Sequence, residues 1–301
     1  MKSLIEQATQ RLEQLRQAGV DMPVTPPVAH AVDAINPSLS TQSNPGPISQ
    51  YIELDLDALA AAGIVSPHAP RSQIADQFRV IKRPLISNAM GKGASVVANG
   101  NLIMISSALP GEGKSFTAIN LAMSMATELD YTVMLVDADV GRPSVMRLLG
   151  LEDGPGLLDL VVDESKDMST MLLKTNIEKL TLLPSGTPHA RATELLASES
   201  MIRLLNQMAK RYADRIIIFD SPPLLLATES RVLASHMGQI VMVVQAEKTL
   251  KSDVAQALAT IEACPVKLML LNQARTIFKG GYEYGQSFGR GYGYGYEQPQ
   301  A

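Results

Sequence analysis

The sequence contains one cysteine, no tryptophan and no long apolar run, and each of these absences excludes a class of protein. The single cysteine, Cys264, allows neither an internal disulfide nor a metal site built from paired cysteines. No stretch approaches the roughly 18 apolar residues that cross a bilayer. The charged N-terminus, residues 1–17, lacks the apolar core of a signal peptide. We therefore expect a soluble protein of a reducing compartment.

The sequence also lacks an excess of positive charge. The chain has 26 Lys and Arg against 30 Asp and Glu, a net charge of −4, so no basic surface indicates nucleic-acid binding. Hydrophobic residues are abundant, at 46% against 19% charged, which is enough for a sizeable core and excludes a wholly disordered chain. The 301 residues fit two domains, or one α/β domain with long extensions.

Three regions of different composition divide the chain at about residues 70 and 275. Residues 1–70 combine an amphipathic helix over 3–18, interpreted as a docking or self-pairing helix, with a proline-rich stretch over 21–70, interpreted as mostly linker. Residues 276–301 are rich in glycine and poor in aliphatic residues, which predicts a disordered tail. Five of the eight tyrosines lie in this tail, namely Tyr282, Tyr284, Tyr292, Tyr294 and Tyr296.

In residues 71–275, short apolar runs alternate with helical patterns. The predicted strands are 102–106, 132–136, 180–183, 215–219, 239–244 and 267–271. The predicted helices are 72–86, which should end or kink near Pro84, 114–128, 193–211 and 250–263. This alternation predicts an α/β domain whose mostly parallel sheet is covered by helices on both faces.

The clearest motif is SALPGEGKS at 107–115, between the first predicted strand and the helix after it. It matches the phosphate-loop pattern GxxxxGK[ST], except that Ala108 stands in the first glycine's place. Lys114 would reach the β- and γ-phosphates of ATP, and the Ser115 hydroxyl would ligate Mg²⁺. The predicted nucleotide-binding residues are Pro110, Gly111, Glu112, Gly113, Lys114, Ser115 and Phe116. The motif predicts a P-loop NTPase, and a chance glycine turn is the alternative.

Acidic residues follow two further predicted strands. Asp137 and Asp139 follow the second strand and Asp220 follows a later one, so all three are expected in one crevice beyond the carboxyl ends of the strands. Such carboxylates repel each other without a cation among them, which predicts a Mg²⁺ site, with helix capping as the alternative role. Asn272, after the last strand, is a candidate for the adenine edge, and loop capping is the alternative.

Together these motifs resemble the bacterial tyrosine kinases, the P-loop autokinases of capsule and exopolysaccharide export. The resemblance covers about residues 71–301. Residues 1–70 lie outside the family's usual kinase domain, and their general look, together with VIKRPL (80–85) and DADVGRPS (137–144), is similar to autokinases linked to exosortase and exopolysaccharide loci. The segments that carry it are PGEGKS (110–115), VDAD (136–139), FDSPP (219–223), PSGTPHARATELLAS (184–198) and the tyrosine-rich tail.

Two features of the resemblance concern single positions. Residues 76–82 are similar to the family's ExxRxxR oligomerisation helix, with Asp76, Arg79 and Lys82 in the three motif places. The family usually has Arg or Lys two residues after the second Asp of the acidic pair, where this chain has Gly141 followed by Arg142.

The resemblance implies an ATP-dependent protein-tyrosine autokinase that regulates exopolysaccharide biosynthesis or export. In the family pattern Asp139 accepts the tyrosine proton, while Asp137 and Asp220 hold Mg²⁺ together with Ser115. Lys114 would neutralise the charge on the transferred group. The tail tyrosines would be the phosphoacceptors, with transfer between subunits of a ring-like homo-oligomer.

The resemblance also implies a partner and a location. An inner-membrane activator of the chain-length-determinant type would hold this cytoplasmic protein peripherally at the inner membrane. The competing interpretation is a partition or cell-division type of P-loop switch ATPase that binds a membrane partner. The two share fold and nucleotide site, and the tyrosine-rich tail favours the kinase.

Overall fold

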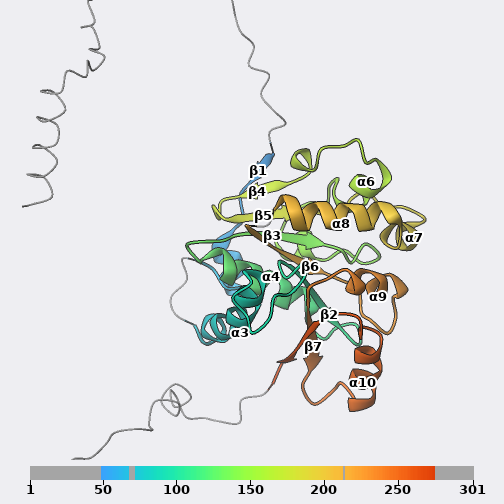
Figure 1. Cartoon of the computed structure of the whole chain (residues 1–301). Coiled ribbons are helices and arrows are strands. Elements are labelled where there is room, and N and C mark those ends of the chain that lie inside the picture. Colours follow the sequence, from blue (N-terminus) through green and yellow to red (C-terminus); the bar gives the residue numbers. More distant parts are fainter. Residues whose placement is uncertain (1–48, 68–71, 213, 275–301) are drawn as a thin grey trace, which may run out of the picture. The chain divides into compact units, whose positions relative to one another are not determined.

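The computed structural model describes residues 49–67, 72–212 and 214–274, which form one eight-stranded sheet flanked by helices (Figure 1). The strands are β1 (Gln50–Ile52), β2 (Leu102–Ser107), β3 (Thr132–Asp137), β4 (Leu173–Thr175), β5 (Leu180–Leu183), β6 (Arg215–Asp220), β7 (Gln239–Gln245) and β8 (Val266–Asn272). Their order across the sheet is β1-β4-β5-β3-β6-β2-β7-β8. Every neighbouring pair is parallel except β4 and β5, which confirms the predicted mostly parallel sheet.

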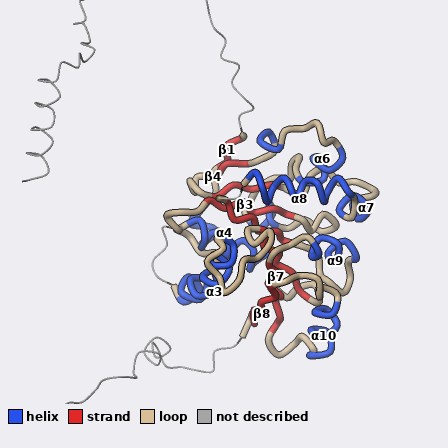
Figure 2. Tube along the Cα trace, in the orientation of Figure 1, coloured by secondary structure: helices blue, strands red, loops and turns tan. Residues whose placement is uncertain are grey.

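The helices connect the strands and cover both faces of the sheet (Figure 2). They are α2 (Leu56–Ala61), α3 (Gln73–Ala89), α4 (Lys114–Ala126), α5 (Val145–Leu148), α6 (Leu157–Val162), the 3₁₀ helix η1 (Met168–Thr170), α7 (Ala192–Leu196), α8 (Glu199–Arg211), α9 (Thr228–Ser235) and α10 (Lys251–Ala259). Since both faces are covered, the central strands are apolar without alternation, as in other parallel sheets.

Strand β2 illustrates how the core is divided between the two faces. Leu102 and Met104 pack into a cluster with residues of α6, α8, α9 and α10. Ile103 and Ile105 point the other way, into a cluster with residues of α3, α4 and α5. All four side chains are fully buried. Successive side chains of β2 therefore point alternately into two hydrophobic cores, one on each face of the sheet, and none of these four points into solvent.

The interpretation of residues 21–70 as mostly linker is wrong for the part that the structure describes. Here β1 pairs with β4, α2 follows it, and the Val65 amide donates to the side-chain oxygen of Asn120 in α4 at 2.8 Å. The buried apolar residues of this segment are Leu54, Leu59, Ile64 and Val65. Residues 1–48, including the predicted helix over 3–18, lie outside the described residues.

Two predicted helix boundaries also differ. Helix α3 does not stop or break near Pro84 but continues to Ala89. The proline lacks the N–H that would bond the carbonyl of Val80, and Val80 is 74% exposed, so water can take that place. The helix predicted over 193–211 is two helices, because the Ser198 hydroxyl accepts from the Met201 amide and caps the second one.

Candidate nucleotide-binding site

The site lies at the carboxyl ends of three neighbouring central strands. In the order β3-β6-β2, Asp137 and Asp220 end adjacent strands and are direct partners in the register. Strand β2 ends at Ser107 and continues into the loop over 108–113, which leads to α4. The phosphate loop and the acidic strand ends therefore meet at one edge of the sheet, where open parallel sheets bind ligands.

The loop has the backbone conformation that its glycines permit. Gly111 and Gly113 have φ values of +83° and +93°, in the left-handed region that favours glycine. A side chain on Gly113 would also collide with Asn272, because its Cβ would lie 2.1 Å from the side-chain nitrogen Nδ2 of that residue. A Cβ on Gly111 would have no neighbour within 4 Å, so its backbone faces open space. Helix α4 begins at Lys114, and its N-terminal N–H groups suit an anion.

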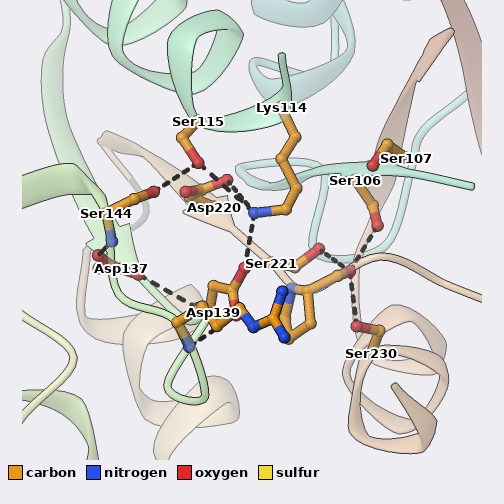
Figure 3. Close-up of polar contacts among 12 residues, drawn as sticks. Ser106, Ser107, Lys114, Ser115, Asp137, Asp139, Ser144, Asp220, Ser221 and Ser230 are labelled. Carbon is orange, nitrogen blue, oxygen red and sulfur yellow. Dashed lines mark hydrogen bonds and ion pairs between the residues drawn. The ribbon is translucent and has the colours of Figure 1, made fainter. Parts of the chain in front are cut away.

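Lys114 joins the loop to the acidic groups (Figure 3). Its Nζ lies 2.6 Å from a carboxylate oxygen of Asp139 and 3.9 Å from one of Asp220. Both carboxylates are buried, and the Asp220 side chain is completely inaccessible. The lysine is therefore shared between two acids, and it stands where an anionic group entering the loop would compete for it.

Burial perturbs the ionisation of Asp220, Asp137 and Lys114. It raises the pKa of Asp220 to about 7, against the opposing effect of Lys114, and it raises the pKa of Asp137 to about 6. Burial alone would lower the pKa of Lys114, but Asp220 and Asp139 more than offset it, so the pKa is raised overall. The acids thus favour a positively charged partner, and Lys114 stays charged.

Asp220 indicates that a further cation fits this site. Among the described residues, no donor forms a hydrogen bond to either of its carboxylate oxygens, although both are buried. Such an arrangement is costly unless a ligand completes it. No group of three or more acidic, histidine or cysteine side chains in the described ranges forms a metal cage by itself. The buried, unpartnered carboxylate of Asp220 beside the phosphate loop suits Mg²⁺, which usually binds one or two carboxylates, keeps water and takes oxygens from phosphate groups.

Ser144 is a site residue that the sequence analysis missed. Its hydroxyl donates to the Ser115 hydroxyl at 2.7 Å, and its amide donates to an Asp137 carboxylate oxygen at 3.0 Å (Figure 3). The Val145 amide binds the same oxygen at 2.9 Å. Ser144 therefore connects the two predicted metal ligands. Its position after Pro143, seven residues beyond Asp137, carries no motif that could have revealed it.

Three of the predicted nucleotide-binding residues lie in different surroundings. The ring of Phe116 packs on the core at the α3 and α4 face, whereas Pro110 is exposed. Asn272 donates its side-chain amide to the backbone carbonyl of Glu112 at 2.9 Å. This contact is the loop-capping alternative left open by the sequence, and a contact to adenine stays a prediction.

The predicted oligomerisation residues do not form one surface. Asp76 and Arg79 are exposed and form an ion pair of 2.7 Å along α3. Lys82 is only 3% exposed and points into its own chain, where Nζ donates to the carbonyl of Ser124 and pairs with Glu128 at 2.7 Å. In this conformation Lys82 is not available to a second subunit. The predicted phosphoacceptors Tyr282 to Tyr296 lie outside the described residues.

Fold and loop together define a P-loop nucleotide-binding protein, and comparison with known proteins narrows this class. The AAA domain family matches residues 100–273. The tyrosine-protein kinase YwqD of Bacillus subtilis is 32% identical over 206 residues, which are 68% of this chain and 83% of YwqD. The putative tyrosine-protein kinase CapB of Staphylococcus aureus is 29% identical over 62% of this chain and 78% of CapB. The chain belongs to the bacterial tyrosine-protein kinases and is an enzyme of that class.

Solved structures and a longer relative show how much of the chain, and of each known protein, is similar. The chimerical protein CapA2B2 has 29% identity and a TM-score of 0.58 over 74% of this chain and 93% of that one. A ParA family ATPase from Chlorobium tepidum, at 21% identity and a TM-score of 0.50, shows the shared fold alone. The tyrosine-protein kinase wzc of Salmonella typhimurium is 29% identical over 195 residues, and the matched region spans only 26% of wzc. No helix among the described residues is long and apolar enough to cross a membrane.

Proposed function

We propose that this chain is an ATP- and Mg²⁺-dependent autokinase that phosphorylates its own C-terminal tyrosines. The observation that carries the proposal is the position of Lys114 Nζ at the start of α4, 2.6 Å from Asp139 and 3.9 Å from Asp220. This arrangement combines an anion-binding loop, a cation and candidate bases within a few ångströms. Those are the parts that phosphoryl transfer requires.

Lys114 has two successive partners in the proposed reaction. Before nucleotide binds, it neutralises Asp139. Phosphate oxygens in the loop then attract the ammonium group, which leaves Asp139 without its counter-charge. The lysine offsets charge on the transferred group, and the loop amides add fixed dipoles in a partly water-excluded site.

Asp139 acts on the acceptor tyrosine. A tyrosine hydroxyl has a pKa of about 10, so ionising it at pH 7 costs about 4 kcal/mol. A carboxylate beside the hydroxyl accepts the proton as the oxygen attacks the γ-phosphorus, and this removes most of that cost from the barrier. Asp139 suits this task because it is released when Lys114 changes partner.

Ser115, Asp137 and Asp220 would hold Mg²⁺, directly or through its water. The bound ion would neutralise charge on the β- and γ-phosphates. The chain's own contribution is the alignment of these ligands. Ser144 binds both Ser115 and Asp137, and the register of β3 against β6 fixes Asp137 opposite Asp220.

The proposed acceptors are Tyr282, Tyr284, Tyr292, Tyr294 and Tyr296, and transfer takes place between subunits of a homo-oligomer. The exposed pair Asp76 and Arg79 on α3 supports subunit contact, and such contact would raise the effective concentration of a neighbour's tail. Each phosphate adds about −1.5 to −2 charges. Tails carrying that charge repel one another, so phosphorylation should dissociate the oligomer.

The biological setting follows from the family resemblance. We propose that the kinase regulates exopolysaccharide biosynthesis or export. It would act at the cytoplasmic side of the inner membrane through an activator of the chain-length-determinant type.

The test uses the inactive variant Lys114→Met, with Lys92→Met, at an exposed position, as the matched control. With Mg²⁺ and ATP, mass spectrometry should find phosphate on the tail tyrosines of the wild type and the control, and none on Lys114→Met. Circular dichroism should show that all three proteins are folded at the assay temperature. Lys114→Met should melt at a lower temperature than the other two, because it leaves the buried carboxylates of Asp139 and Asp220 without their counter-charge. Phosphorylation of Lys114→Met at the wild-type rate would refute the site assignment.

Transfer between subunits has its own experiment. Lys114→Met, which keeps its tail, is mixed with an active copy truncated after residue 275. Phosphate on the inactive copy is the expected result. If the tyrosines of the inactive copy stay unmodified while full-length wild type is phosphorylated, transfer occurs within one chain.

A further inference from the structure

The phosphate loop contains a buried carboxylate to which the proposed reaction assigns no task. Glu112 lies between the two glycines of the loop and is only 2% exposed. A negative charge beside a site for phosphate groups opposes their binding. A compensating role of Glu112 should therefore lie in the contacts that its side chain forms.

Those contacts hold the loop from two sides. One carboxylate oxygen of Glu112 accepts from the Leu109 amide at 2.6 Å, which closes the loop on itself. The other accepts from the hydroxyl of Thr249, 137 residues further along the chain. The same Thr249 oxygen accepts from the Gln245 amide at 3.1 Å, so its proton is directed to Glu112. The single donor of this hydroxyl and one of its two acceptor lone pairs are therefore used.

The backbone of Glu112 is held as well. Its carbonyl accepts from the side-chain amide of Asn272 at 2.9 Å. Asn272 ends β8 and pairs in register with Gln245 at the end of β7. The end of β8 therefore binds the main chain of Glu112, and Thr249, which is held by the end of β7, binds its side chain. The residues that flank Glu112 are Gly111 and Gly113, and glycine has more backbone freedom than any other residue, so the loop gains from such support.

We propose that Glu112 and Thr249 are positioning residues, whose contact fixes the phosphate loop in its binding conformation before nucleotide arrives. This inference rests on the proposed nucleotide site. The contact reduces the ordering cost of binding, so it governs affinity for the nucleotide. The rate of transfer from bound ATP is left unchanged, because neither side chain touches Lys114 or Asp139.

The test compares Thr249→Val, which keeps the shape but removes the donor, with Thr249→Ser, which keeps the donor. Thr260→Val is the matched control, because the Thr260 hydroxyl caps α10 away from the loop. Loss of a hydrogen bond to a charged group should weaken equilibrium binding of ADP roughly tenfold in Thr249→Val. Thr249→Ser and Thr260→Val should bind ADP like the wild type.

Two further measurements separate positioning from a general loss of stability. The KM for ATP should rise in Thr249→Val while kcat at saturating ATP stays at the wild-type value. Hydrogen exchange at the amides of 109–113 should be faster than in the wild type without nucleotide, and equal to it with ADP bound. Glu112→Gln, which keeps the shape and loses the charge, should show the same exchange pattern.

The outcomes distinguish this inference from the proposed function. If wild type binds no adenine nucleotide, the proposed function itself fails. If wild type binds ADP and Thr249→Val binds it equally well, the inference is wrong. A kcat that falls as much as KM rises, or a Thr249→Ser as weak as Thr249→Val, would also overturn it.

Discussion

Lys82 offers the sharpest test of how the structure differs from the family pattern. The resemblance places it in an oligomerisation motif, whereas the structure buries it against the C-terminus of α4. Nζ donates to the Ser124 carbonyl and pairs with Glu128 at 2.7 Å, and the side chains of Lys82 and Glu128 are 4% and 22% exposed. Lys82→Met keeps the aliphatic stem and removes only these polar contacts. The structure predicts a loss of stability, not a loss of subunit contact.

The size of this loss follows from burial. Removing one partner of a buried ion pair costs about 3–5 kcal/mol. Water reaches Glu128 from its exposed side and reduces that cost, while the unmatched carbonyl at the helix end adds to it. We expect about 3 kcal/mol, which in a domain of this size lowers Tm by roughly 6–12 °C. Arg83→Met is the matched control, because Arg83 approaches the same Glu128 at 3.5 Å but is 64% exposed. It should cost less than about 1 kcal/mol.

The pH dependence has a definite sign. The hydrogen bond from Lys82 is the main cause that lowers the pKa of Glu128 below the ordinary value of 4.5. A carboxyl whose pKa is lower in the folded state stabilises the fold above its unfolded pKa. The Tm difference between wild type and Lys82→Met should therefore be full above pH 4.5 and shrink as pH falls further.

Thermal melting followed by circular dichroism measures stability, and light scattering on the same samples measures oligomer size. The reasoning is refuted if Lys82→Met melts within about 2 °C of Arg83→Met, a gap smaller than 1 kcal/mol produces. It is refuted equally if Lys82→Met keeps its Tm but loses its oligomer, since Lys82 would then act between subunits.

Three further variants test the site and the surface. Asp139→Asn should keep ADP affinity, because Lys114 loses only a competing partner, while tyrosine phosphorylation falls about 10²- to 10⁴-fold in a radiolabel assay; unchanged phosphorylation would exclude Asp139 as the base. Ser144→Ala should raise the Mg²⁺ concentration for half-maximal ATP binding in titration calorimetry, and Ser144→Thr should restore it; equal Mg²⁺ dependence in all three proteins would contradict the link to Ser115. Arg79→Ala should leave the free energy of unfolding within about 0.5 kcal/mol, since its ion pair is exposed, yet reduce oligomer size in light scattering; an unchanged size would remove α3 as a subunit surface.

The central sheet could be predicted from sequence because most of its strands are continuous apolar runs that are buried on both faces. Each of the six strands predicted between residues 102 and 271 forms, and the boundaries differ by one residue at most. Strands β1 and β4 were missed, because runs of three residues have no detectable period. Segment 49–67 was misinterpreted, because its prolines dominate the composition while its buried residues are scattered.

At the candidate site, the sequence motifs indicated which residues to consider, but they did not indicate which side chains contact one another. The loop motif and the strand ends predicted that Lys114, Asp137 and Asp220 lie at one edge of the sheet, and the structure places them there, while their roles stay predictions. The environment of Lys82 was not predictable, because an amphipathic helix places a long cation equally well in water or along its own chain. Thr249 was missed because its partner is 137 residues away and neither residue stands in a motif that pairs them.

Helix α4 has a mechanical consequence. Its 13 residues span about 20 Å at 1.5 Å each, and nearly all are buried in a close-packed interior that resists compression. One end begins at Lys114, beside the phosphate loop, and the other is held by Lys82 on α3. The helix is therefore a rigid connection between the phosphate loop and α3, whose exposed face contains Arg79. A small displacement at the loop should therefore also displace the residues of α3 that contact the other end of α4. In the homo-oligomer proposed above, a subunit bound at α3 would then respond to whether the loop is occupied.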